Sequence, residues 1–188
     1  MSDNDRRRAI EGAIFLVLFC LTIPAANWMI GHLGTVCVPN GPCLVPVAPG
    51  VAAPSGVLMV GAALVLRDLV QRRLGIGFGI AAIAVGAAIS AGLAPASLVV
   101  ASATAFLLSE FADFLVYTPL ARRRLVAAVV ASSVAGLVVD SIVFLWLAFG
   151  SLEFLFGQII GKLWMVLIAA PLVAWVRRRD ERLGLKAV

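Results

Sequence analysis

The chain has 188 residues, of which 62% are hydrophobic and only 13% are charged. A soluble domain carries about 45–50% apolar and about 25% charged residues, so this chain is too apolar to cover a water-facing surface. Its formal net charge of +5 comes from short basic clusters beside apolar runs. Such clusters are typical of membrane orientation signals and argue against a nucleic-acid-binding face.

The composition predicts an all-α integral membrane protein that forms one domain over residues 1–188, without room for a soluble catalytic domain. A spanning helix needs about 20 apolar residues. We therefore expect six transmembrane helices, at about 10–31, 54–72, 74–93, 95–117, 125–149 and 152–176. A signal peptide is the alternative for the first run, but Glu11 lies inside it and Pro24-Ala25-Ala26 lacks the small-x-small cleavage pattern.

Residues 32–51 are rich in Pro and Gly, so we expect an outward loop that cannot span the membrane. Its length among short outer links predicts a lid over a binding site. Cys37 and Cys43 lie in this loop and would face an oxidising compartment, where either a disulfide or two free thiols remain open. A metal site is not expected, because His32 is the only histidine and the cysteines lack zinc-like spacing.

Small residues recur at i+3 or i+4 spacing along the third predicted helix. They are Gly75, Gly79, Ala82, Gly86 and Ser90. Such a stripe predicts a face for close helix packing, and we assign this helix no chemistry. Cys20 in the first helix is likewise expected to pack.

The basic residues fall on one side of a six-helix arrangement, and the opposite loops carry no Lys or Arg. They are Arg6–Arg8, Arg72, Arg73, Arg122–Arg124, Arg177–Arg179, Arg182 and Lys186. This positive-inside pattern predicts that both termini are cytoplasmic in a multi-pass protein of the cell inner membrane.

Six ionisable residues lie within the apolar runs, namely Arg67, Asp68, Glu110, Asp113, Asp140 and Lys162. Each costs about 2.5–3.5 kcal/mol at mid-membrane, so such residues normally mark a ligand or ion path. The alternative is that they only clamp helices together, and Arg67 and Asp68 could also be boundary residues that snorkel. Their formal sum of −2 requires protonated acids, a bound cation or a donor-rich ligand, as expected of a proton- or cation-coupled carrier.

Asp140 and Lys162 are predicted to form one unit near the midplane. At a rise of about 1.5 Å per residue, each lies roughly 15 Å from the outer end of its helix. Their helices are joined by a short link and carry opposite charges, so each is the nearest available partner for the other. A ligand that separates them would offer a route to proton coupling.

Glu110 and Asp113 share a helix face at i, i+3, and Phe106 and Tyr117 extend that face. Carboxylates between aromatic rings suit a flat heterocycle with N–H donors, although ordinary packing of the aromatic residues is the alternative.

Two further helices present polar residues of the same kind. Gln158 shares a face with Phe154 and Lys162 at i+4 spacing, and Asn27 lies near the outer end of the first helix. Its neighbour Trp28 has the alternative role of an interface anchor.

In this order and spacing, the chain resembles the queuosine precursor transporter family, also called the VUT or vitamin uptake transporter family. The resemblance covers about Pro24 to Arg179. Its markers are Asn27, Pro54-Ser55-Gly56, Arg67-Asp68, Gly75, Ser109-Glu110-Phe111-Ala112-Asp113, Tyr117-Thr118-Pro119-Leu120, Gly136-Leu137-Val138-Val139-Asp140-Ser141 and Gly161-Lys162.

The resemblance implies import of a 7-deazaguanine compound for queuosine synthesis, either 7-cyano-7-deazaguanine, its aminomethyl relative or queuine. It also implies a helix count similar to that of the substrate-binding subunits of energy-coupling-factor importers. The candidate substrate-binding residues are Asn27, Phe106, Glu110, Asp113, Asp140, Gln158 and Lys162, with Arg67, Asp68 and Tyr117 as secondary candidates.

Other functions stay open at this stage. A vitamin-binding subunit would need a separate ATPase, because the sequence has no P-loop. An intramembrane protease would have to use Asp113 and Asp140, since paired acids can share a proton. A membrane scaffold without transport is a further alternative. We expect a small-molecule substrate and the lipid bilayer as partners, no nucleic acid and no cofactor, and leave a homodimer open.

Overall fold

The computed structural model describes residues 3–39, 41–93, 96–121 and 125–184. Within these ranges the side chains of residues 3, 97, 110, 113–114, 117–118, 120–121, 125–130, 132–133 and 177 are not described. The elements are α1 (Asp3–His32), β1 (Val36–Cys37), β2 (Cys43–Ala48), β3 (Val51–Pro54), α2 (Val57–Leu74), α3 (Ile76–Leu93), α4 (Ala96–Ala121), α5 (Leu125–Phe149) and α6 (Leu155–Leu183).

Each predicted apolar run is helical, but several helix ends differ from the prediction. The first helix begins at Asp3 rather than Ile10, and the last continues to Leu183 rather than Val176. Hydropathy cannot locate these ends, because the added turns are charged. In α6, Asp180 of the added turn pairs with Arg72 and Arg73, and Arg179 pairs with Glu11. Pro54, predicted to begin a helix, instead ends β3, and α2 starts at Val57.

By length and composition, three helices of the described chain could cross a membrane, namely α1, α3 and α6. The second helix is interrupted by four charged residues, Arg67, Asp68, Arg72 and Arg73. Shorter apolar stretches lie in α4, at Leu98–Ser109, and in α5, at Val134–Phe149.

The segment predicted as an outward loop contains an antiparallel sheet with the order β1-β2-β3. Cys37 pairs with Cys43 across the first two strands, and a disulfide joins them. Pro46 is tolerated because it is exposed and borders an irregularity in the β2–β3 register, where its missing N–H costs little. The sequence analysis predicted a loop because these short strands are apolar throughout, without the alternation typical of a half-buried strand, and contain prolines that suggest turns.

The sheet packs on the first turns of α6 and α2. Val47, Ala53 and Val57 form a small buried core, against which Leu58 and Ile160 pack. The indole Nε1 of Trp164 donates to the carbonyl of Val47 over 2.8 Å. Gly157 permits the close approach, since a Cβ there would clash with the carbonyl oxygen of Ala52.

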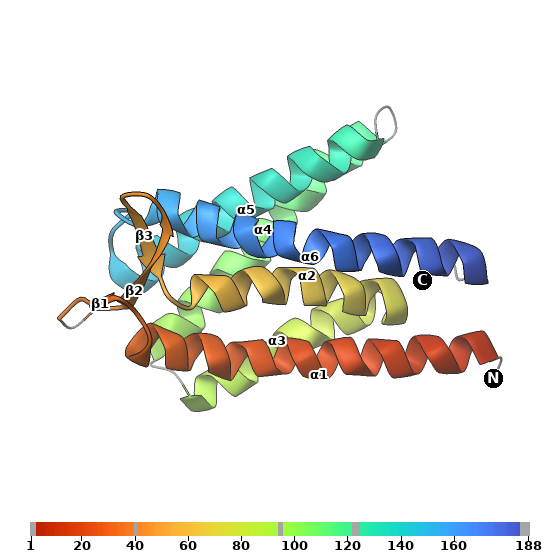
Figure 1. Ribbon diagram of the computed structural model, residues 1–188, viewed down its shortest axis with the longest axis horizontal. Helices are drawn as coiled ribbons and strands as arrows, with labels where there is room; N and C mark the ends of the chain where they lie inside the picture. Colours follow the sequence, from red (N-terminus) through yellow and green to blue (C-terminus); the bar gives the residue numbers. More distant parts are fainter. Residues whose placement is uncertain (1–2, 40, 94–95, 122–124, 185–188) are drawn as a thin grey trace.

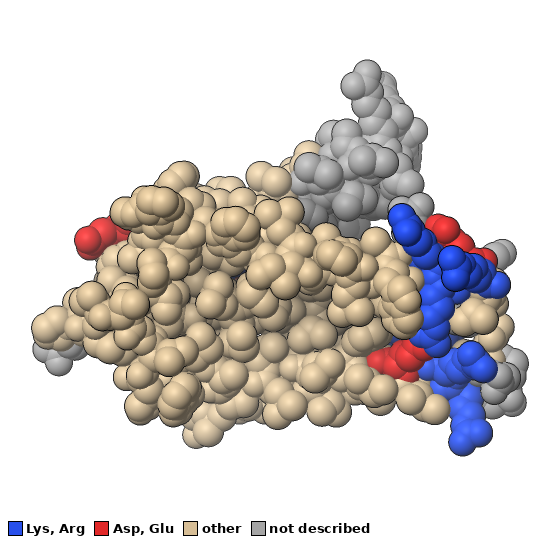
Figure 2. Space-filling model, in the orientation of Figure 1, with Lys and Arg blue, Asp and Glu red and all other residues tan. Residues whose placement is uncertain are grey.

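Figure 1 shows the sheet at one end of the helices and both termini at the other. The second and sixth helices run side by side between these ends, while α4 and α5 diverge from α6 towards the end that carries the termini (Figure 1). The Lys and Arg side chains visible on the face drawn in Figure 2 gather at that same end. This clustering of basic side chains at one end agrees with the one-sided distribution of Lys and Arg along the sequence.

Candidate functional site

A cavity of about 150 Å³ lies among all six helices, in the half nearer the sheet. It is lined by residues that include Asn27 of α1, Ser90 of α3, Phe106 of α4, Asp140 of α5 and Lys162 of α6. A cavity of about 150 Å³ is the size that accommodates a small aromatic ring. The cavity can therefore hold the core of a flat heterocycle.

Lys162 and Asp140 form an ion pair at the wall of this cavity. Lys162 is 1% exposed and Asp140 7%. The ammonium also donates to the hydroxyl of Ser141 over 2.9 Å, and that hydroxyl donates in turn to the carbonyl of Leu137 over 2.8 Å. The predicted contact between Asp140 and Lys162 is present, because the short α5–α6 link brings the two helices together as antiparallel neighbours.

The pair keeps hydrogen-bonding capacity for a ligand. An ammonium has three N–H donors, and the described residues accept two of them, through Asp140 and Ser141. Lys162 engages Oδ2 of Asp140, whereas Oδ1 receives no donor from the described chain. One N–H and one carboxylate oxygen thus remain available beside the cavity.

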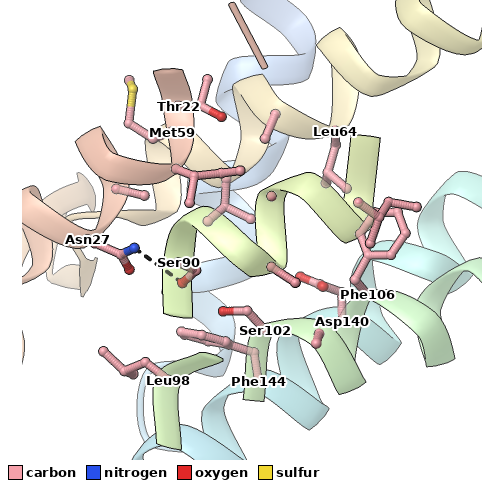
Figure 3. A pocket seen from close by; sticks show the side chains of 18 of the residues that line it. Thr22, Asn27, Met59, Leu64, Ser90, Leu98, Ser102, Phe106, Asp140 and Phe144 are labelled. Carbon is pink, nitrogen blue, oxygen red and sulfur yellow. Dashed lines mark hydrogen bonds between the residues drawn. The ribbon is translucent and has the colours of Figure 1, made fainter. Parts of the chain in front are cut away.

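Other polar groups line different parts of the wall. The amide of Asn27 donates to the hydroxyl of Ser90 over 3.3 Å, and Phe106 and Asp140 lie together on another part of the wall (Figure 3). Gln158 also lines the cavity, is 2% exposed, and has its Oε1 buried without a hydrogen-bond partner in the described chain.

The third helix contributes more than the packing face predicted for it. Its small-residue stripe does pack, since Gly86 lies against Phe19 and Ile23 of α1. Ser90 at the end of that stripe also lines the cavity and accepts a hydrogen bond from Asn27, a contact that the sequence did not predict. In the sequence, Ser90 follows glycines and alanines at helical spacing. That pattern does not distinguish a serine that packs between helices from one that lines a cavity.

Arg67 and Asp68 pair with each other, and Asp68 is 66% exposed. The guanidinium carbon of Arg67 lies 5.3 Å from the centroid of the Phe106 ring, which links α2 to α4 at the cavity wall. Neither Arg67 nor Asp68 lines the cavity in the described chain. The snorkelling interpretation therefore fits Asp68, while Arg67 contacts a cavity residue from behind.

Three predicted residues cannot be placed in the site. Glu110, Asp113 and Tyr117 belong to α4, but their side chains lie outside the described residues. Their proposed contact with a heterocycle stays a prediction. Among the described side chains, no group of three His, Cys, Asp or Glu residues could hold a metal ion.

A second charged group, which the sequence interpretation missed, lies at the end that carries the termini. We call it the ion-pair cluster, and it consists of Glu11, Arg72, Arg73, Arg179 and Asp180. Arg73 and Asp180 each have a side chain that is 1% exposed. The cluster ties α1, α2 and α6 together.

The cluster lies further along α2 and α6 than the cavity residues do. On α2, the buried Leu69 and Val70 lie between Leu64, which lines the cavity, and Arg73. On α6, the buried Val176 lies between Lys162 and Asp180. The cluster is therefore a charged group separate from the cavity.

The comparisons with known proteins bear on what this cavity is for. A family model described as "Putative vitamin uptake transporter" matches residues 76–176, which is more than half of the 188-residue chain. The matched region includes both Asp140 and Lys162. No curated protein and no solved structure matches the chain significantly.

Proposed function

Since the chain belongs to the vitamin uptake transporter family, we propose that it imports a 7-deazaguanine precursor of queuosine across the cell inner membrane. The candidate substrates are 7-cyano-7-deazaguanine, its aminomethyl relative and queuine. One observation carries the proposal, namely the buried Asp140–Lys162 pair at the wall of a cavity to which all six helices contribute.

The chemistry of the pair suits the edge of a guanine-like ring. That edge offers N–H donors beside a carbonyl oxygen, and carboxylates accept from such donors in base recognition. Oδ1 of Asp140 can accept, and the third N–H of Lys162 can donate to the carbonyl. The Phe106 ring, on the same cavity wall, supplies a face for stacking.

In the proposed cycle, the six helices span the membrane with both termini in the cytoplasm, and the cavity opens towards the outer side. Substrate competes with Lys162 for Asp140 and so weakens the contact between α5 and α6. The opening of this contact is the step at which substrate movement would be coupled to a proton or another ion. The carrier then needs no ATPase of its own.

The test is uptake and binding of radiolabelled 7-deazaguanine compounds by purified protein in liposomes without ATP. We expect Asp140→Asn and Lys162→Met each to abolish uptake. The double variant has no unpaired buried charge, so it should fold but remain inactive. Recovery of uptake in the double variant would reduce the pair to a structural clamp. Glu153→Gln, at an exposed position before α6, is the control.

The alternative is a vitamin-binding subunit that depends on a separate ATPase. That protein would bind its ligand in the same assay but would show no uptake until the ATPase partner and ATP were added. Binding without uptake by the chain alone would therefore favour the alternative.

A further inference from the structure

The side chain of Gln158 is unusual among the cavity residues because its Oε1 atom has no hydrogen-bond partner in the described part of the chain. It lies one helical turn before Lys162 on α6 and is 2% exposed. Its backbone N–H donates to the carbonyl of Phe154 over 2.8 Å, so the residue is held in regular helix. Its Oε1 nevertheless accepts no hydrogen bond from any described residue.

An unsatisfied buried carbonyl is costly, and most buried polar groups in native proteins have a partner. Apolar side chains would fill this part of α6 at no such cost. The buried Oε1 belongs to a residue that lines the cavity, so a donor that arrives with the ligand would satisfy it once the amide turns towards the cavity. Binding sites often keep a functional residue at a position where another residue would make the protein more stable.

We infer that Gln158 determines substrate specificity by accepting an N–H from the ligand. The inference rests on the proposed function and sharpens it to one chemical class, a planar ring that presents two adjacent N–H donors. Asp140 on α5 accepts one of them and Gln158 on α6 accepts the other. In a 2-amino-4-oxo ring these donors are the ring N–H and the exocyclic amine.

The first arm of the test compares two ligands that differ only in that amine, 7-deazaguanine and 7-deazahypoxanthine. Binding is measured on the full purified chain. The parent protein should prefer 7-deazaguanine by about tenfold to a hundredfold, the value of one buried hydrogen bond. Gln158→Met, of similar shape, should reduce the preference to less than about threefold. If Gln158 had only a structural role, Gln158→Met would weaken the binding of both ligands equally and leave the preference unchanged.

Gln71 provides a matched control, since it lies on α2 outside the cavity in the described chain. Gln71→Met should keep the preference of the parent protein. Equal binding of the two ligands by the parent, or an intact preference in Gln158→Met, would overturn the inference.

The second arm needs no ligand. Removing an unsatisfied carbonyl should leave empty Gln158→Met at least as resistant to thermal unfolding as the parent protein. A clear loss of thermal stability would show that the amide has a structural partner and would overturn the inference. If the parent binds neither ligand, the proposed substrate is wrong; if it binds both equally, the proposed function stands and only the inference about Gln158 fails.

Discussion

The guanidinium of Arg73 on α2 holds the carboxylate of Asp180 on α6 through two parallel hydrogen bonds, Nη1 to Oδ2 at 2.9 Å and Nη2 to Oδ1 at 2.7 Å. Bidentate pairs of this kind combine strength with fixed geometry. The same guanidinium lies 2.8 Å from Glu11 of α1, and Arg72 donates to Asp180 over 3.0 Å. Three helices distant in sequence are thus joined at one point.

Asp180→Asn should lower the free energy of unfolding by about 3 kcal/mol, because Arg73 would lose a buried partner. We expect the lower end of the usual range since Glu11 still pairs with Arg73. Thermal or denaturant unfolding in detergent measures the effect. Glu153→Gln, at an exposed position before α6, is the control. Equal stability of Asp180→Asn and the parent would show that the pair contributes nothing.

Gly157→Ala should separate the sheet from α6 and destabilise the protein by about 1–3 kcal/mol, as overpacking does. The added Cβ would meet the backbone of Ala52, which cannot move without shifting β3. Gly77→Ala on α3 is the matched control, because open space surrounds that position and alanine favours the helix. Similar unfolding temperatures for the two variants would contradict the close approach.

Trp164→Phe tests the sheet as a lid. The variant loses the hydrogen bond to the carbonyl of Val47 but keeps an aromatic ring on α6. If the sheet retains the ligand, its dissociation rate should rise about fivefold, equivalent to about 1 kcal/mol. A pulse-chase with unlabelled ligand measures that rate, and Trp146→Phe on α5 serves for comparison. An unchanged rate would count against the lid.

Glu110→Gln tests the prediction that the acids of α4 read the donor edge of the ligand. The substitution keeps the shape and removes the charge, so the loss of one charged hydrogen bond should cost about 1.5–3 kcal/mol of binding. Isothermal titration with 7-deazaguanine provides the measurement. If Glu110→Gln binds 7-deazaguanine as tightly as the parent protein does, Glu110 is not part of the binding site.

The helices and the central ion pair were predictable from the sequence, for one physical reason. Apolar runs of sufficient length fix the helices, and a charge within such a run is so costly that it needs a partner at equal depth. Asp140 and Lys162 met both conditions. Helical spacing from charged residues brought Phe106 and Gln158 to attention, and Asn27 was noted as a polar residue near the end of its helix; all three line the cavity.

The ion-pair cluster and the sheet escaped prediction because their signals have commoner explanations. Arg72 and Arg73 at a helix end are normally solvated orientation charges, and nothing local indicates that Asp180, more than a hundred residues later, will bury one of them. The strands were concealed because Pro46 and Pro54 suggest turns. The lack of a partner for Gln158 depends on the positions of all its neighbours, which a single sequence does not contain.

The position of Asp180 near the end of the chain has a consequence for biogenesis. A chain emerges from the ribosome from its N-terminus, so Arg72 and Arg73 are made long before Asp180, and Glu11 is the one acid of the ion-pair cluster that precedes them. Basic residues at the end of a helix can serve as orientation signals during this interval. Only when α6 is made can Asp180 form its ion pairs with both arginines. We therefore expect the two arginines to serve first as orientation signals and afterwards as the contact that joins α2 to α6.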